Sequence, residues 1–289
     1  MKPRGRGGPA DFARRWQRAA ELATTPGVEQ PLAVLVAVLD HQQARAKDAT
    51  VLAAAALVGL DGTRRAAAGT YPVLDVKAAA DSVDAGVAVA TRALARGAVA
   101  LPEPLLAAAR LLEAPPLRGE TIRAWLADPN LVDPRLGFWV SVAAQPVLEL
   151  AAEDVRPPGP QQWTAAQCPV CGGVPQVGVI AEESGEFMAG SPRSLICGRC
   201  ASRWGYPRAT CVACGEDDSR RISSWTAQMW PAIRIDSCDT CRAYIKTFDL
   251  RRPGGRDVVP LVDDVASATL DLWATDQGLQ RSVRSTAGV

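Results

Sequence analysis

Apolar residues recur at helical spacing through the first 160 residues. Phe12, Trp16 and Leu22 fall near one face of segment 12–23, and the turn-forming stretch TTPG ends that pattern. A long or broken helix is predicted from Pro31 to Gly59, because proline suits the first turn of a helix. Further helices are predicted over residues 75–97, 102–114, 119–129 and 133–154. Alternation typical of strands is scarce, so an all-helical domain of about six helices is expected.

The pattern changes after VRPPGPQQW (155–163), whose three prolines and one glycine predict a linker. Beyond it, the short apolar segments VPQVGVI (174–180) and AIRID (232–236) are typical of strands. A final helix is predicted over residues 262–278, with apolar positions at Val265, Leu270, Leu272 and Trp273. Asp263 and Asp264 lie in its first turn, where the helix dipole favours negative charge.

Composition narrows the functional classes. The chain has 289 residues, of which 48% are hydrophobic, and this is enough for a sizeable core. A net charge of +1 gives no reason to expect a nucleic acid or a membrane surface as partner. The basic N-terminus lacks the apolar run of a secretory signal, and no apolar run approaches the roughly 18 residues of a membrane span. We therefore predict a cytoplasmic protein without a membrane span.

All of the cysteines lie in four Cys-x-x-Cys pairs: Cys168 with Cys171, Cys197 with Cys200, Cys211 with Cys214, and Cys238 with Cys241. In a reducing compartment, thiols at this spacing are more typical of metal sites than of disulfides. Two cysteines on one tight turn can direct both sulfurs at one point. Two such turns then form a tetrahedral cage of four sulfurs.

The four pairs also form a weak repeat. Cys168-Pro-Val-Cys171-Gly172 resembles Cys211-Val-Ala-Cys214-Gly215, and each is followed by a second pair at similar spacing. This predicts two sites from consecutive pairs, each binding one metal ion. The predicted fold class is α+β, with two tandem rubredoxin-like or zinc-ribbon modules after the helical domain. The boundaries are 1–160 for the helical domain, 161–205 for the first module, and 206–289 for the second module with its C-terminal helix.

Three aspects of these sites stay open. Zinc and iron both accept four thiolates, and Ala201 and Arg242 stand where a rubredoxin-like iron site tends to have glycine. Disulfides are disfavoured by the compartment, and a thioredoxin-type redox pair usually occurs only once. The small modules are expected to need metal in order to fold, whereas residues 1–150 should stay helical without it.

Catalysis by side chains has little support. The single histidine, His41, is predicted on a solvated helix face, so no catalytic residue and no enzymatic activity are predicted. Trp125, Phe138 and Trp139 are expected in the helical core. Zinc ribbons often bind nucleic acid, but residues 161–250 hold as many Arg and Lys as Asp and Glu. Two metal tetrathiolates would add negative charge, and this favours a protein partner.

An ordered string over residues 165–281 resembles the formate dehydrogenase accessory protein family. Beyond the cysteines, it includes Arg193-Ser-Leu195, Trp204, Arg208, Tyr244, Lys246, Val262-Asp263-Asp264 and Leu270-Asp271. The resemblance implies a cytoplasmic maturation factor, or chaperone, with a helical domain and two rubredoxin-like modules. It also implies iron in the cysteine sites. The expected client is the catalytic subunit of a respiratory formate dehydrogenase, bound at a surface between the domains.

Trp204, Arg208, Arg234, Tyr244 and Lys246 could serve that client surface or brace the ribbons. Two further functional classes stay open beside the accessory factor. One is a zinc-ribbon scaffold or an adaptor for nucleic acid or protein, which salt-dependent DNA or RNA binding would reveal. The other is a thiol oxidoreductase using a Cys-x-x-Cys pair, which would need an exposed cysteine of low pKa.

Overall fold

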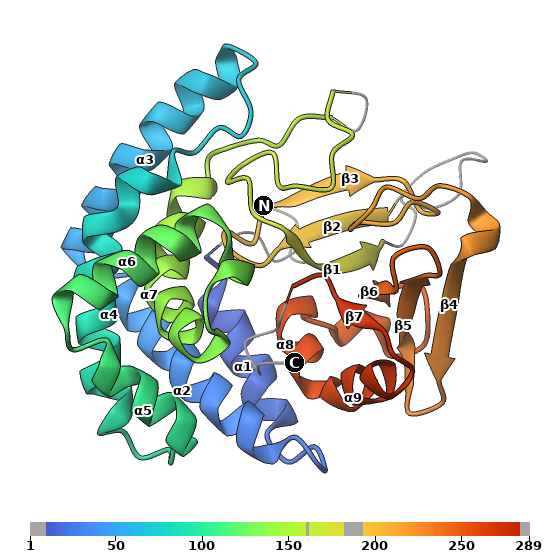
Figure 1. The fold of residues 1–289 in the computed structure, drawn as a ribbon, viewed down its shortest axis with the longest axis horizontal. Coiled ribbons are helices and arrows are strands. Elements are labelled where there is room, and N and C mark those ends of the chain that lie inside the picture. Colours follow the sequence, from blue (N-terminus) through green and yellow to red (C-terminus); the bar gives the residue numbers. More distant parts are fainter. Residues whose placement is uncertain (1–9, 160–161, 182–192, 284–289) are drawn as a thin grey trace.

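The structure, a computed structural model, describes residues 10–159, 162–181 and 193–283. Along residues 10–159 the chain forms seven α-helices (Figure 1): α1 Phe12–Leu22, α2 Glu29–Arg45, α3 Ala49–Ala67, α4 Ala80–Ala95, α5 Glu103–Leu111, α6 Pro115–Ala127 and α7 Pro134–Ala152. The apolar run that begins at Pro31 is divided in two, because Asp48 caps α3 by accepting a hydrogen bond from the Thr50 backbone N–H. The predicted helical region is thus confirmed, with one more helix than expected.

Helix α7 forms the centre of the helical half. It is apolar on nearly all sides and packs against α2, α3, α4, α5 and α6. Gly86 brings α4 close to α7, since a Cβ at this position would lie 3.0 Å from the Cβ of Ala143. Trp125, Phe138 and Trp139 are buried as predicted, and the Trp139 indole N–H donates to the Leu105 carbonyl at 2.9 Å.

The C-terminal half is built on one sheet of seven strands within the described residues: β1 Pro175–Ile180, β2 Arg193–Cys197, β3 Arg203–Tyr206, β4 Ile222–Ala227, β5 Trp230–Cys238, β6 Ala243–Asp249 and β7 Gln280–Arg281. The order is β3-β2-β1-β6-β5-β4, and β7 also pairs with β6. The predicted strands 174–180 and 232–236 correspond to β1 and β5. Strands β1 and β6 are parallel, with Val177 opposite Lys246, so the two cysteine-bearing segments share a continuous sheet.

Two short helices, α8 Pro260–Ala266 and α9 Ala268–Asp276, replace the single helix predicted near the C-terminus. The chain leaves helical geometry at Ser267, whose φ and ψ are −101° and 26°. Val262 and Val265 of α8 pack against α1 and α2, whereas Leu270 of α9 packs against strands β5 and β6. Leu272 and Trp273 are exposed rather than in the core.

The fold class is therefore as predicted: a helical N-terminal region precedes a sheet region that carries two clusters of four cysteines. Figure 1 shows the helices of the N-terminal half on one side and the sheet on the other, with α8 and α9 against the sheet. Among the helices of the described residues, none combines the length and the apolar character that a membrane crossing requires.

Candidate metal centres

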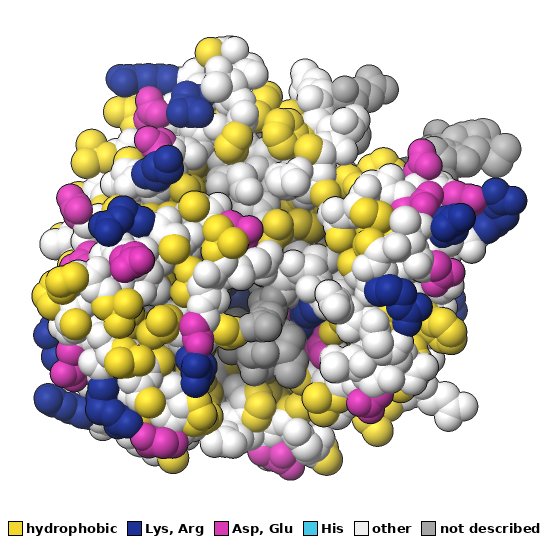
Figure 2. Space-filling view, viewed as in Figure 1, with side chains coloured by type: hydrophobic (Ala, Val, Ile, Leu, Met, Phe, Trp, Pro, Cys, Tyr) yellow, Lys and Arg dark blue, Asp and Glu magenta, His cyan; other side chains and the backbone are white. Residues whose placement is uncertain are grey.

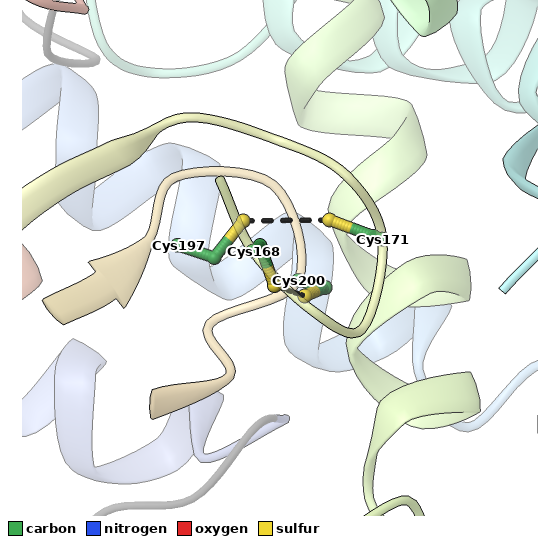
Figure 3. Close-up of side chains that lie close together, drawn as sticks. All are labelled: Cys168, Cys171, Cys197 and Cys200. Atoms are coloured by element: carbon green, nitrogen blue, oxygen red, sulfur yellow. Dashed lines mark hydrogen bonds between the residues drawn. The ribbon is translucent and has the colours of Figure 1, made fainter. Parts of the chain in front are cut away.

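The first centre, formed by Cys168, Cys171, Cys197 and Cys200, joins two turns. Cys168 and Cys171 lie on the turn before β1, while Cys197 ends β2 and Cys200 lies on the turn to β3. Figure 3 shows the four side chains pointing toward one another. The Sγ atoms of Cys168 and Cys200 are 3.7 Å apart, and those of Cys171 and Cys197 are 3.4 Å apart. All four cysteines are buried.

The second centre, formed by Cys211, Cys214, Cys238 and Cys241, repeats this arrangement. Its first turn follows β3, and its second turn connects β5 to β6. The Sγ atoms of Cys211 and Cys241 are 3.6 Å apart, and those of Cys214 and Cys238 are 3.8 Å apart. Cys214 is exposed and Cys241 is half-buried, so this centre reaches the surface.

Sulfur separations show that each cluster fits a metal ion. A disulfide would bring two sulfurs to about 2.05 Å, and all eight cysteines are free. A tetrahedron with metal–sulfur bonds of about 2.3 Å has edges of about 3.8 Å. In each cluster the four sulfurs lie within 4.8 Å of one another. The two clusters can therefore bind two metal ions, and consecutive pairs form each cluster.

The residue after each pair has a positive φ, and this position shapes the turn. The φ values are 72° at Gly172 and 78° at Gly215, but also 53° at Ala201 and 60° at Arg242. Backbone N–H groups then face the sulfurs; for example, the Arg199 N–H donates to the Cys197 Sγ at 3.4 Å. The turns thus adopt the same conformation without glycine. The absence of glycine at residues 201 and 242 is no argument against iron, and the sulfur ligands suit iron and zinc alike.

The first centre disfavours four charged thiolates when no cation balances them. Burial raises the pKa of Cys168 and of Cys200. Burial opposes ionisation of Cys197 too, but hydrogen bonds from the three other thiols lower the pKa of Cys197. Hydrogen bonds from the neighbouring thiols therefore favour a thiolate at Cys197. A divalent or trivalent cation would remove the penalty on the remaining charges, because metal binding displaces the thiol protons.

Two buried arginines, Arg193 and Arg199, hold the cysteine turns, a role that was not predicted from the sequence for either residue. Arg199, inside the pair Cys197–Cys200, donates to the carbonyls of Trp125 and Leu126 at 2.9 and 3.1 Å, so the first centre is tied to the C-terminus of α6. Arg193 donates to the Thr210 carbonyl at 2.7 Å beside Cys211. The signal in the sequence was their place within or next to the cysteine motifs.

Three of the five candidate partner-binding residues are buried. Lys246 is fully buried, and its Nζ lies 2.9 Å from an Asp264 carboxylate oxygen and 2.5 Å from an Asp271 carboxylate oxygen. Tyr244 donates from its hydroxyl to Asp271 at 2.8 Å. Burial, followed by the charge of Asp271, raises the pKa of Tyr244. Trp204 is 3% exposed.

The other two candidates, Arg208 and Arg234, are half-buried. The Arg234 Nε lies 2.9 Å from a carboxylate oxygen of Asp236. His41 was predicted on a solvated helix face, but its side chain is half-buried. Burial, followed by the charge of Arg45, lowers the pKa of His41.

A cavity of about 590 Å³ opens between the helical half and the first centre. Its walls include Trp125 and Phe138 from α6 and α7, Gln145, and Arg199 from the first cysteine turn. Three arginines but no aspartate or glutamate belong to its lining among the described residues. A bound segment would contact both halves of the molecule.

Comparison with known proteins finds relatives that match part of this chain. Residues 209–286 match the family model described as "FdhE, C-terminal domain". A "Protein FdhE homolog" of Aquifex aeolicus is 35% identical over 159 residues, which are 55% of this chain and 54% of that protein. The chain is therefore similar to FdhE proteins over part of its length.

Other FdhE relatives match a shorter stretch. A homolog from Shewanella baltica (strain OS223) is 38% identical over 107 residues, which are 37% of this chain and 33% of that protein. The chain thus spans about half or less of the length of these curated relatives. The crystal structure of the FdhE protein from Pseudomonas aeruginosa superposes with a TM-score of 0.67 at 23% identity, covering 96% of this chain and 95% of that one. The two proteins share the fold over nearly their whole length.

Proposed function

We propose that this protein is a cytoplasmic accessory factor that binds the catalytic subunit of a respiratory formate dehydrogenase and is needed for its activity. In this proposal it does not turn over formate itself. The observation that carries the proposal is the match of residues 209–286 to the FdhE C-terminal domain, together with the two cysteine clusters. The eight cysteines are the proposed metal ligands, binding one metal ion in each cluster.

The chemistry of the clusters supports a role without turnover at the metal. Catalytic zinc sites keep one coordination position open for water or substrate. In each cluster described here, four cysteine sulfurs would bind one metal ion, so a tetrahedral ion would have no open coordination position for water or substrate. Iron in these clusters would supply one electron of redox capacity per centre, and zinc would supply none.

Surface charge supports a protein client. Figure 2 shows acidic and basic side chains interspersed across this face, with both signs gathered at the outer end near β4. A nucleic-acid site would normally be clearly basic. We therefore rank the zinc-ribbon adaptor for nucleic acid below the accessory factor.

Within this proposal, the client segment binds in the cavity between the two halves. Aromatic walls at Trp125 and Phe138 suit apolar side chains of such a segment. Trp204, Tyr244 and Lys246 are assigned to bracing the sheet, because they are buried.

The proposal is tested by formate dehydrogenase activity in cells lacking this protein, together with anaerobic co-purification of the two proteins. We expect activity to be lost, to be restored by the wild-type chain, and not to be restored by Cys211→Ser. Arg110→Ala removes an exposed ion pair with Glu103 and serves as the control that restores activity. Normal activity without the protein and no association would refute the accessory role.

A second pair of variants tests the cavity. Ser141→Trp would place a large side chain inside it, and should weaken co-purification of the client. Thr63→Trp is the matched control, since Thr63 is an exposed position of α3 whose hydroxyl also donates to a backbone carbonyl of its own helix. Equal co-purification by the two variants would place the client elsewhere.

A further inference from the structure

The two cysteine centres have opposite surroundings. In the first centre, the four cysteines are at most 3% exposed and belong to the same hydrophobic core as α7. In the second centre, Cys214 is exposed and Cys241 is half-buried, although Cys211 and Cys238 are buried. The repeat in the sequence therefore produces two sites that differ strongly in access from solvent.

The helical half closes the first centre. Backbone N–H groups of Val73 and Leu74 donate to the carbonyls of Pro169 and Val170 at 3.1 and 2.8 Å. On the other turn, the Gln145 amide donates to the Gly198 carbonyl at 3.1 Å. The first cysteine turn is therefore held by the segment that follows α3, and the second turn is held by α7 and, through Arg199, by α6. A competing ligand can reach this metal only if these contacts separate.

Among the described residues, none covers the outer turn of the second centre in this way. Ala213, Cys214 and Gly215 are all exposed. The two equivalent glycines show the difference directly. A Cβ on Gly172 would lie 3.3 Å from the Pro72 side chain, whereas a Cβ on Gly215 would meet no atom of the described residues within 4 Å.

One side of the second centre is nevertheless anchored. The Tyr206 hydroxyl donates to the Cys211 carbonyl at 3.1 Å, and Arg193 holds the neighbouring Thr210 carbonyl. Cys238 is 1% exposed at the end of β5. Cys211 and Cys238 are thus held in place, whereas the sulfur of Cys214 is exposed. Cys214 is therefore the first ligand that an incoming group can replace.

We propose that the second centre is an exchangeable metal site, whereas the first is a permanent structural site. An incoming thiolate, carboxylate or amine donates a lone pair to the metal beside Cys214, and the metal–sulfur bond to Cys214 breaks. That thiolate takes a proton from water. Repeated at the other three sulfurs, this transfers the ion to the incoming ligands without oxidation or reduction. The inference rests on the metal binding of the proposed function, and it names which centre exchanges metal with solutes or with a chelating partner protein.

The test uses the whole 289-residue chain loaded with zinc and mixed with excess EDTA. Zinc is measured before mixing, and a content near two ions per chain supports the metal sites themselves. Zinc should then leave in two phases of equal amplitude, the faster at least about tenfold quicker, because the slow site needs local opening of the helical contacts. A single phase that releases both ions would overturn the inference.

Matched variants assign the phases, since Cys214 and Cys171 are the same position of the repeat. Cys214→Ser should remove the fast phase and Cys171→Ser the slow one.

Cys171→Ser could fail to fold because Cys171 is buried. The unmodified protein therefore provides a second readout: N-ethylmaleimide present during chelation should label Cys211, Cys214, Cys238 and Cys241 before the other four cysteines. Labelling of the first centre ahead of the second would overturn the inference. Failure of the proposed metal sites is distinguished by zinc contents well below two ions before any chelator is added.

Discussion

The residue after each cysteine pair has a left-handed backbone whatever its side chain. Ala201 and Arg242 adopt positive φ, as do Gly172 and Gly215. For a residue with a Cβ, this conformation costs roughly 1–2 kcal/mol. The turns therefore impose the conformation on the residue, because backbone N–H groups must face the sulfurs for the metal site to form.

Alanine at the two glycines should separate backbone strain from steric contact. Gly215→Ala should lower the free energy of unfolding by about 1 kcal/mol, since only the positive φ opposes it. Gly172→Ala should lower it further, because its Cβ also meets Pro72 at 3.3 Å. Gly119→Ala, inside α6, is the control and should raise stability by about 0.5–1 kcal/mol. Urea denaturation of the metal-loaded protein measures all three, and equal losses at Gly172 and Gly215 would refute the steric argument.

At the scale of elements, a buried ionic cluster fastens α8 and α9 to the sheet. Lys246 of β6 and Arg281 of β7 face Asp264 of α8 and Asp271 of α9, so two positive charges meet two negative ones. Tyr244 and Gln176 add hydrogen bonds to the same carboxylates. Each helix is too short to be stable alone, so its position depends on these contacts.

Removal of one cation from this cluster should be strongly destabilising. Lys246→Met leaves two buried carboxylates facing one arginine, and we expect a loss of about 3–5 kcal/mol in unfolding free energy. The exposed pair Arg110–Glu103 provides the control, since Arg110→Met should change stability by at most about 0.5 kcal/mol. Thermal and urea unfolding measure the difference. A loss below about 1 kcal/mol for Lys246→Met would show that the cluster is not needed.

Acid should weaken the same cluster through Asp264. Burial opposes ionisation, but Arg281 and Lys246 outweigh it and lower the pKa of Asp264. A lowered pKa stabilises the fold above the unfolded value of about 3.9, and this contribution is lost as the pH falls through the folded pKa. Asp264→Asn should therefore flatten the fall in stability below about pH 4. Stability profiles from pH 7 to pH 2 measure it. If the stability of the variant falls with acid as steeply as that of the wild type, Asp264 is not the group responsible.

The whole molecule is more integrated than a chain of separate modules. One hydrophobic cluster includes helical residues such as Trp139 together with Cys168, Leu195 and Trp204 of the sheet region. The parallel pairing of β1 with β6 then connects the first cysteine segment to the second. That residues 1–150 stay helical without metal remains a prediction. Because the cysteines of the first centre belong to the same hydrophobic cluster, we expect the packing of these helices to loosen when the metal is lost.

Loss of metal from the first centre should loosen the helical half. In Cys171→Ser, hydrogen exchange should accelerate at Val73, at Leu74 and at the C-terminal turn of α6, since these groups bond to the first cysteine turns. In Cys214→Ser, the same amides should stay protected. Exchange followed by mass spectrometry compares the two variants. Equal protection of these amides in both would show that the two halves are independent.

The sequence by itself determined the features that depend on local spacing. Helical periodicity depends on neighbours three and four residues apart, and the Cys-x-x-Cys turn depends on four consecutive residues. The helical half, the two cysteine clusters and the family resemblance were therefore predictable. The division of the chain at Asp48 and at Ser267 was less clear, because both breaks interrupt continuous apolar patterns.

Only the tertiary structure decided which side chains are inside and which cysteine centre meets solvent. Tyr244 and Lys246 look like surface candidates in the sequence, yet β6 lies between β1 and β5 and is covered by α8 and α9. Trp204 of β3 is buried instead in the hydrophobic cluster that the sheet shares with the helical half. The repeat also gives Gly172 and Gly215 the same local role, but Pro72 covers only the first. These differences depend on contacts between residues about 20 to 100 positions apart, which have no local period. Burial by distant segments therefore makes two similar motifs physically different.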